Sequence, residues 1–194
     1  TKPNVLQSVK TKINSLETSG GTNIEAGLML ARNNLDSKTV DGIDYLYTIL
    51  LTDGEPTMYV DGNRTSVNRI DGNGLGYGAT EESVKDIGTL ANNIKEKGNG
   101  LSKLYSICCG EDVWNSKPFH SWSGVTPSVT EKTTIGEWLQ AFSTAAYKSD
   151  SADNLFDNFS SILEQIKIAT KAFRVSDHMG ENITAEQIIS GGKN

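Results

Sequence analysis

Two short segments of the chain carry oxygen-bearing side chains at the ends of expected secondary-structure elements. Gly20-Gly21-Thr22-Asn23 precedes a helical pattern, and Thr52-Asp53-Gly54 follows an apolar run typical of a strand. In an open α/β sheet such element ends lie along one edge, where ligands bind. The hydroxyl of Thr22 and the carboxylate of Asp53 therefore suit a hard cation such as Mg²⁺, which prefers oxygen ligands.

Each of these residues also has a simpler interpretation. Thr22 and Glu25 have the spacing of a capping box, in which the hydroxyl and the glutamate accept hydrogen bonds from free amides at the helix start. Asp53, which precedes Gly54, is equally typical of a turn or an N-cap. Glu55 is either a carboxylate that supports the site or a solvated loop residue. Capping and metal contact compete for the same hydroxyl, so both interpretations stay open.

The composition is that of an ordinary globular chain. Its 194 residues, 36% hydrophobic and 22% charged, suffice for one domain with a substantial core. No apolar run approaches the roughly 20 residues that span a bilayer. The net charge of −6 argues against nucleic acid, whose phosphates would be repelled. Cys108 and Cys109 are adjacent and should point to opposite faces of a strand, so no disulfide framework is expected.

Apolar periodicity predicts an alternation of helices and strands. The predicted helices cover residues 3–17, 24–35, 81–97, 135–147 and 152–168, and the predicted strands cover 43–52, 104–109 and 171–175. The strand at 43–52 is expected to be buried on both faces. Residues 58–79 and 110–134 lack periodicity and should form long loops, the first of which is a second candidate for partner contact. This order predicts an α/β domain with a doubly wound, mostly parallel sheet and helices on both faces.

Over most of residues 1–176 the sequence resembles the von Willebrand factor type A (vWA) domain family. The resemblance rests on Gly-Gly-Thr-Asn-Ile followed by Gly27-Leu28, the apolar strand into Thr-Asp-Gly, the Leu-Tyr-Ser-Ile strand, and the run from Tyr147 through Asn154-Leu155 to Phe159. It implies a Rossmann-like fold in which Thr22 and Asp53 belong to a metal-ion-dependent adhesion site and help to hold Mg²⁺ or Mn²⁺. An acidic side chain of a protein partner would complete the coordination. Residues 177–194 are expected to be a linker or the start of a following module.

One motif of that family is absent. The Asp-x-Ser-x-Ser of the first family strand, whose serines bind the metal directly, has no counterpart, because Asp36-Ser37-Lys38 and Asp150-Ser151-Ala152 lack its spacing. In family terms roughly 60 residues, about two β–α units, would precede Thr1. We therefore expect a partial domain without its N-terminal strands, which binds metal weakly or not at all. Its exposed sheet edge should associate with the missing N-terminal segment or with another copy.

The expected function is recognition, and the protein is not expected to be an enzyme. No nucleophile elbow, P-loop or zinc-protease motif is present, and His120 and His178 are typical of surface residues. The Gly- and Asn-rich loops look similar to bacterial cell-surface or pilus adhesins, which implies an extracellular location and a protein ligand such as host extracellular matrix, without membrane insertion. Two alternatives remain: a Mg²⁺-dependent phosphotransfer domain with Asp53 as phosphoacceptor, and an intracellular vWA scaffold that works with an ATPase. The aromatic residues at 114–122 form either a partner-binding patch or an anchor for their loop.

Overall fold

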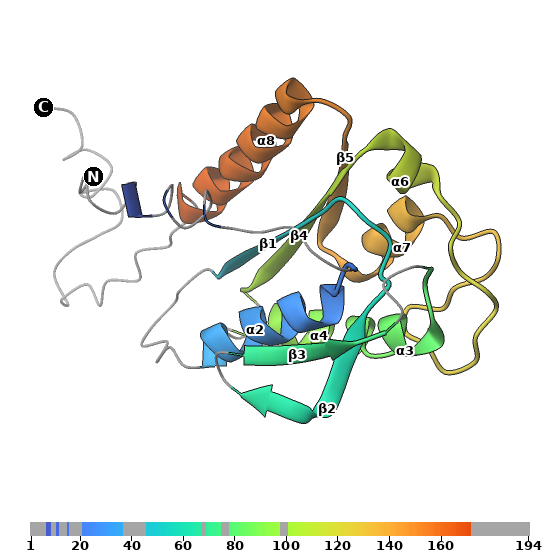
Figure 1. Ribbon diagram of the computed structural model, residues 1–194. Coiled ribbons are helices and arrows are strands. Elements are labelled where there is room, and N and C mark those ends of the chain that lie inside the picture. Colours follow the sequence, from blue (N-terminus) through green and yellow to red (C-terminus); the bar gives the residue numbers. More distant parts are fainter. Residues whose placement is uncertain are drawn as a thin grey trace, which may run out of the picture. The chain divides into compact units, whose positions relative to one another are not determined.

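The computed structural model describes residues 7–8, 11, 15, 21–36, 46–66, 69–74, 78–97 and 101–171. In chain order the elements are α2 (Ile24–Asp36), β1 (Tyr47–Thr52), β2 (Tyr59–Ser66), β3 (Arg69–Asn73), α3 (Glu81–Val84), α4 (Ile87–Lys95), β4 (Lys103–Cys109), α6 (Glu111–Asn115), α7 (Ile135–Phe142), β5 (Ala145–Ser149) and α8 (Ala152–Lys171) (Figure 1). Contacts divide the chain into two units, Thr1–Ser160 and Ser161–Asn194. All described residues of the second unit belong to α8.

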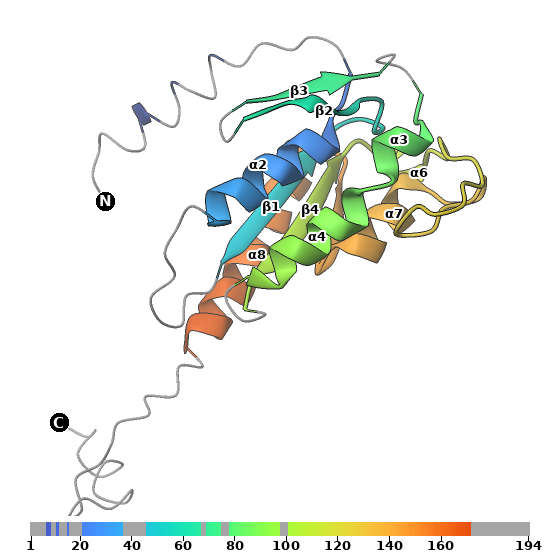
Figure 2. The same ribbon diagram turned by 90° about the horizontal axis from the view of Figure 1, so that it is seen from below.

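Three parallel strands form the main sheet of the first unit, in the order β1-β4-β5. The strand β4 is central: its residues pair in continuous register with β1 on one side and with β5 on the other. Helices flank this sheet, and α2 and α4 lie side by side in both views (Figures 1 and 2). The predicted α/β class with a parallel sheet is confirmed, and the arrangement is compatible with a Rossmann-like fold.

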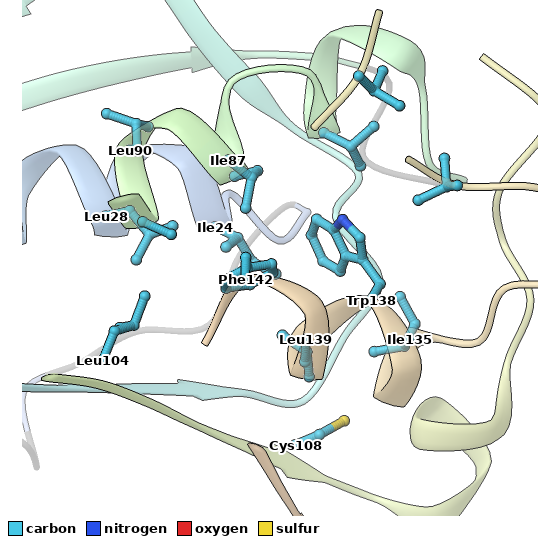
Figure 3. Close-up of a cluster of buried hydrophobic side chains, with 14 of the residues drawn as sticks. Ile24, Leu28, Ile87, Leu90, Leu104, Cys108, Ile135, Trp138, Leu139 and Phe142 are labelled. Atoms are coloured by element: carbon cyan, nitrogen blue, oxygen red, sulfur yellow. The ribbon is translucent and has the colours of Figure 1, made fainter. Parts of the chain in front are cut away.

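The hydrophobic core lies between one face of this sheet and the helices α2, α4 and α7 (Figure 3). From β4 the fully buried side chains of Leu104 and Cys108 point into it. The indole of Trp138 on α7 lies 5.1 Å from the ring of Phe142 and 5.3 Å from that of Phe119, measured between ring centroids. Burial of one face of each element in this cluster holds helices and sheet together.

The loop between α6 and α7 is anchored by its aromatic residues. Phe119 is buried, and its ring makes an edge contact with Trp122 at 6.3 Å between centroids. Trp114 packs against Gly136 of α7, where a β-carbon would overlap with the indole. These contacts favour the interpretation that the aromatic residues at 114–122 fix the loop against the core.

Three strands, β2, β3 and β5, arise where the sequence predicted other structure. The expected loop at 58–79 contains an antiparallel hairpin of β2 and β3, whose register is irregular between Val60 and Thr65. Backbone hydrogen bonds form such a hairpin without the apolar alternation that marks a half-buried strand. The strand β5 takes up residues that were predicted to end a helix at 135–147, and α7 stops at Phe142 instead. Its Ala-Ala pair has helical propensity, but pairing with the buried strand β4 overrides that preference.

The remaining predictions meet mixed outcomes. The helices α2 and α8 and the strand β4 are confirmed, whereas the helix predicted at 81–97 is split into α3 and α4 by a turn at Lys85 and Asp86. Most of the helix predicted at 3–17, residues 172–175 of the last predicted strand and the predicted boundary after residue 176 lie outside the described residues.

The prediction that the strand at 43–52 is buried on both faces is wrong. The side chains of Ile49 and Leu51, which share one face of β1, are 37% and 51% exposed. Leu50 on the other face packs against the core. Among the described residues, helices pack on the core-facing side of β1, where Leu50 is partly buried and Thr52 is buried, and the face that carries Ile49 and Leu51 is left exposed.

Candidate functional site

The two segments that carry Thr22 and Asp53 meet in space, as the sequence predicts. Thr22 forms an isolated parallel bridge with Pro56. The amides of Thr57 and Met58 both donate to the carbonyl of Thr22 at 3.0 Å. In return the amide of Thr22 donates to the hydroxyl of Thr57 at 2.9 Å. The backbone just before α2 is therefore fixed beside the segment that follows β1.

The hydroxyl of Thr22 lies directly against Gly54, the residue after Asp53. A β-carbon at position 54 would overlap with Oγ1 of Thr22, so only glycine allows this approach without a shift. The turn itself is held by Thr52, whose hydroxyl donates to the carbonyl of Gly54 at 3.2 Å. Thr22 and Asp53 thus lie within one short stretch of surface at the carboxyl end of β1.

The capping-box interpretation of Thr22 is wrong. The cap is supplied by Asn23, whose Oδ1 accepts a hydrogen bond from the amide of Ala26 at 2.9 Å. Glu25 does not turn back to the helix start but accepts from the amide of Val60 at 2.7 Å. Within the described part of the chain, no hydrogen bond engages the Thr22 hydroxyl. It therefore remains available to a ligand.

Asp53 is an exposed residue in a bend, with no helix after it that it could cap. No hydrogen bond or ion pair to the described residues engages its carboxylate. Its charge reaches the end of the neighbouring strand, where it contributes to the raised pKa values of Cys108 and Cys109. Burial is the larger cause in both, and it raises the pKa of the Cys108 thiol to about 11. Both cysteines are free, as predicted, and these protonated thiols are poor nucleophiles at neutral pH.

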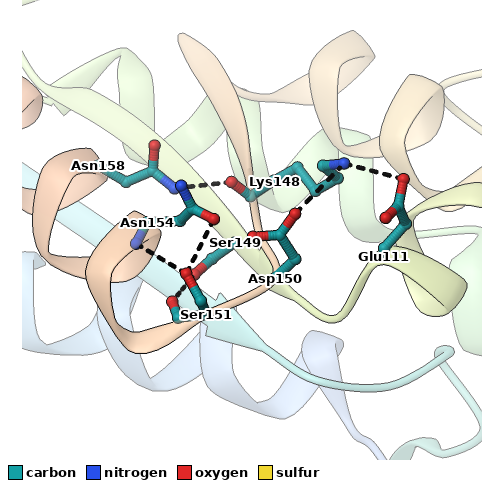
Figure 4. Close-up of polar contacts among 7 residues, drawn as sticks. All are labelled: Glu111, Lys148, Ser149, Asp150, Ser151, Asn154 and Asn158. Atoms are coloured by element: carbon teal, nitrogen blue, oxygen red, sulfur yellow. Dashed lines mark hydrogen bonds and ion pairs between the residues drawn. The ribbon is translucent and has the colours of Figure 1, made fainter.

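The carboxyl ends of β4 and β5 extend the same edge of the sheet (Figure 4). Lys148 bridges Glu111 of α6 at 3.0 Å and Asp150 at 3.7 Å, and its hydrogen bond to Glu111 raises the pKa of the ammonium. Ser151 caps α8 by accepting from the amide of Asn154 at 3.1 Å. A cavity of about 260 Å³ lies here, lined by Cys109, Gly110, Ser149, Asp150, Ser151, Ala152 and Leu155. This part of the edge was not predicted as a candidate site, because residues 145–147 were assigned to the end of a helix and not to a strand.

The chemistry of this edge suits a hard cation only in part. Thr22 and Asp53 provide a hydroxyl and a carboxylate oxygen, which are ligands that Mg²⁺ accepts while it keeps several waters. Among the described residues no group of three or more His, Cys, Asp or Glu side chains could hold a metal ion. A cation here would depend on water and a partner for most of its ligands.

A second polar site lies beside the hairpin. Glu25, in the first turn of α2, is buried and lines a cavity of about 430 Å³ together with Met29, Tyr59, Val60, Glu82, Lys85 and Asp86. Burial raises the pKa of Glu25, and the amide of Val60 partly offsets this effect. The carboxylate thereby ties the start of α2 to β2, which fixes the position of the neighbouring Thr22.

Replacing Glu25 with glutamine should change how stability depends on pH. Because the pKa of Glu25 is raised above its ordinary 4.5, the folded state holds the proton more tightly than the unfolded chain. The stabilisation that protonated Glu25 adds to the free energy of unfolding is therefore complete below pH 4.5. It is lost as the pH rises through the pKa of Glu25 in the folded state. Glutamine does not titrate, so the stability of Glu25→Gln should not fall in this pH range. Relative to the wild type, its free energy of unfolding should therefore increase as the pH rises. Urea unfolding at several pH values measures the difference, with Glu131→Gln as the control at an exposed glutamate outside this cavity. A difference that is constant with pH would contradict the assignment.

Comparison with known proteins supplies no relative. No protein-family model, curated protein or solved structure matches this chain. None of the described helices is long and apolar enough to cross a membrane.

Proposed function

We propose that the chain is a vWA-type binding domain that recognises the acidic side chain of an extracellular protein through a divalent cation. Thr22 and Asp53 would hold Mg²⁺ or Mn²⁺ at the carboxyl end of β1, and the partner's carboxylate would complete the coordination. In this proposal the three parallel strands belong to a larger doubly wound sheet. The cation supplies charge to bind an anion, and no bond of the partner is broken.

One observation carries the proposal: the Thr22 hydroxyl is not used by the helix cap and lies against Gly54, beside the exposed Asp53. A threonine that merely began a helix would have its hydroxyl on an amide of the first turn. The paired backbone contacts with Thr57 and Met58 hold this arrangement before any ligand binds. Such preorganisation reduces the entropy cost of binding.

Calorimetric titration of Mn²⁺ into the chain and its variants tests the proposal. With only two protein ligands, we expect a dissociation constant on the order of millimolar. Asp53→Ala should abolish the binding, and Thr22→Val, which keeps the backbone contacts, should weaken it by roughly tenfold, the equivalent of one lost ligand contact of about 1.4 kcal/mol. Asp36→Ala is the control, because Asp36 lies at the far end of α2, roughly 20 Å away along the helix.

Two results would remove the proposal. Binding that is equal in the wild type and in Asp53→Ala would place the cation elsewhere. Phosphorylation of Asp53 by acetyl phosphate would favour the phosphotransfer alternative, in which this carboxylate attacks phosphorus and the site is catalytic.

A further inference from the structure

The cavity of about 430 Å³ beside the hairpin is lined by a buried carboxylate that is only partly hydrogen-bonded. Glu25, from the first turn of α2, is 8% exposed. Its Oε2 accepts a hydrogen bond from the amide of Val60 at 2.7 Å, whereas its Oε1 has no hydrogen-bond partner among the described residues. Taking a carboxylate out of water is costly unless donors or a positive charge compensate it. The Oε1 atom is therefore left for a ligand in the cavity.

The other charged residues of this cavity are mainly acidic. Glu82 of α3 and Asp86, which precedes α4, add two carboxylates, and Lys85 is the one cation among the described residues that line it. Asp86 is the N-cap residue of α4, yet its side chain makes no cap hydrogen bond. In the part of the chain that the structure describes, no ion pair engages any of these three residues. A positive group in the cavity would therefore meet carboxylates that have no other partner.

The remaining walls of the cavity are apolar or aromatic. Met29, four residues after Glu25 and so on the same face of α2, lines it together with Tyr59 and Val60 of β2. The hairpin lies along α2, and α3 contacts both α2 and β2 (Figures 1 and 2). Such walls suit an alkyl chain, and a tyrosine ring attracts a cation to its face. A metal ion fits less well, because no three of the described His, Cys, Asp and Glu side chains could hold one.

We propose that this cavity binds a primary ammonium group on an alkyl chain, as in a lysine side chain or a free alkylamine. The ammonium would donate to Oε1 of Glu25 and be attracted by Glu82 and Asp86. Its alkyl chain would pack against Met29 and Val60. The volume of the cavity lies in the range of small-ligand sites. The proposal does not depend on the cation site at the end of β1.

Calorimetric titration of n-butylamine into the whole chain tests this site, with 1-butanol as the neutral counterpart. The wild type should bind the amine with a dissociation constant on the order of millimolar and should not bind the alcohol. Glu25→Gln, which can still accept the hydrogen bond from Val60, should weaken amine binding at least about tenfold. Lys85→Gln should strengthen it roughly two- to threefold, because a competing positive charge is removed. A purely structural role of Glu25 does not predict this second effect.

Glu131→Gln is the matched control, because it removes one carboxylate at an exposed position outside the cavity. It should bind the amine as the wild type does, and circular dichroism checks that each variant is folded. Asp86→Asn disturbs no cap hydrogen bond and should also weaken binding, which keeps the test valid if the Glu25 variant does not fold.

Three results would overturn the proposal: no amine binding at tens of millimolar, equal binding of 1-butanol, or unchanged affinity in both Glu25→Gln and Asp86→Asn. The source of the ammonium has its own measurement, with Nα-acetyl-lysine methylamide, which presents the same group from a peptide backbone. Tighter binding than that of n-butylamine would indicate a lysine of a protein partner, and weaker binding would indicate a free amine.

Discussion

Replacing Trp138 with alanine is expected to lower the free energy of unfolding by about 3–5 kcal/mol. The side chain is 1% exposed and joins α7 to the loop residue Phe119 and to Phe142. Its loss removes a large apolar surface and leaves a cavity that these rings can fill only partly. Nε1 of the indole has no hydrogen-bond partner among the described residues, so the loss is one of packing.

Denaturant unfolding of Trp138→Ala and of a matched variant measures this effect. Phe156→Ala removes another aromatic ring, but one that is 71% exposed, and should change stability by less than about 0.5 kcal/mol. The contrast between the two rings isolates burial from residue type. A loss below about 1 kcal/mol for Trp138→Ala would contradict the central place given to this side chain in the core.

Replacing Gly88 with alanine should destabilise the protein by about 1–3 kcal/mol, although alanine is the better helix former. Gly88 lies in the first turn of α4, and its amide donates to the carbonyl of Thr126 at 2.8 Å. A β-carbon would overlap with that carbonyl oxygen and lie 2.6 Å from the carbonyl carbon. Because both atoms are backbone, the loop must move and the hydrogen bond must lengthen.

Gly27→Ala is the control for this substitution. Gly27 is also a helical glycine, in α2, but a β-carbon there would meet nothing within 4 Å. It should follow helix propensity and stabilise the protein by about 0.5–1 kcal/mol. Thermal or urea unfolding should give changes in stability of opposite sign for the two variants. If Gly88→Ala stabilised the protein, the loop at Thr126 would not approach α4 this closely.

The parts of the fold that the sequence predicts are those with a strong apolar pattern. The stripe of Ile24, Leu28 and Leu35 predicts α2, and the run from Leu104 to Cys109 predicts β4. The strand β5 was missed because Ala, Tyr and Lys carry no strand pattern of their own. Its pairing with β4, a contact distant in sequence, determines its conformation.

In the candidate site too, local sequence predicts some features, and contacts between residues distant in the sequence determine others. The motifs around Thr22 and Asp53 predict that the two segments meet, and they do. The capping-box interpretation of Thr22 was wrong because Thr22 and Asn23 are both good N-caps, and local spacing alone does not distinguish them. Asn23 also donates to the carbonyl of Tyr59 at 3.2 Å, a contact with the unpredicted hairpin that favours its position at the cap.

Paramagnetic broadening of amide NMR signals by Mn²⁺ tests the central claim most directly, because it locates the cation as well as detecting it. The proposal predicts that the amides of Asn23 and Gly54 broaden first, at low Mn²⁺, and that Asp53→Ala removes the effect. Signals of Lys95, which ends α4, should stay sharp. Broadening centred on Glu82 and Asp86, or none at millimolar Mn²⁺, would contradict a cation site formed by Thr22 and Asp53.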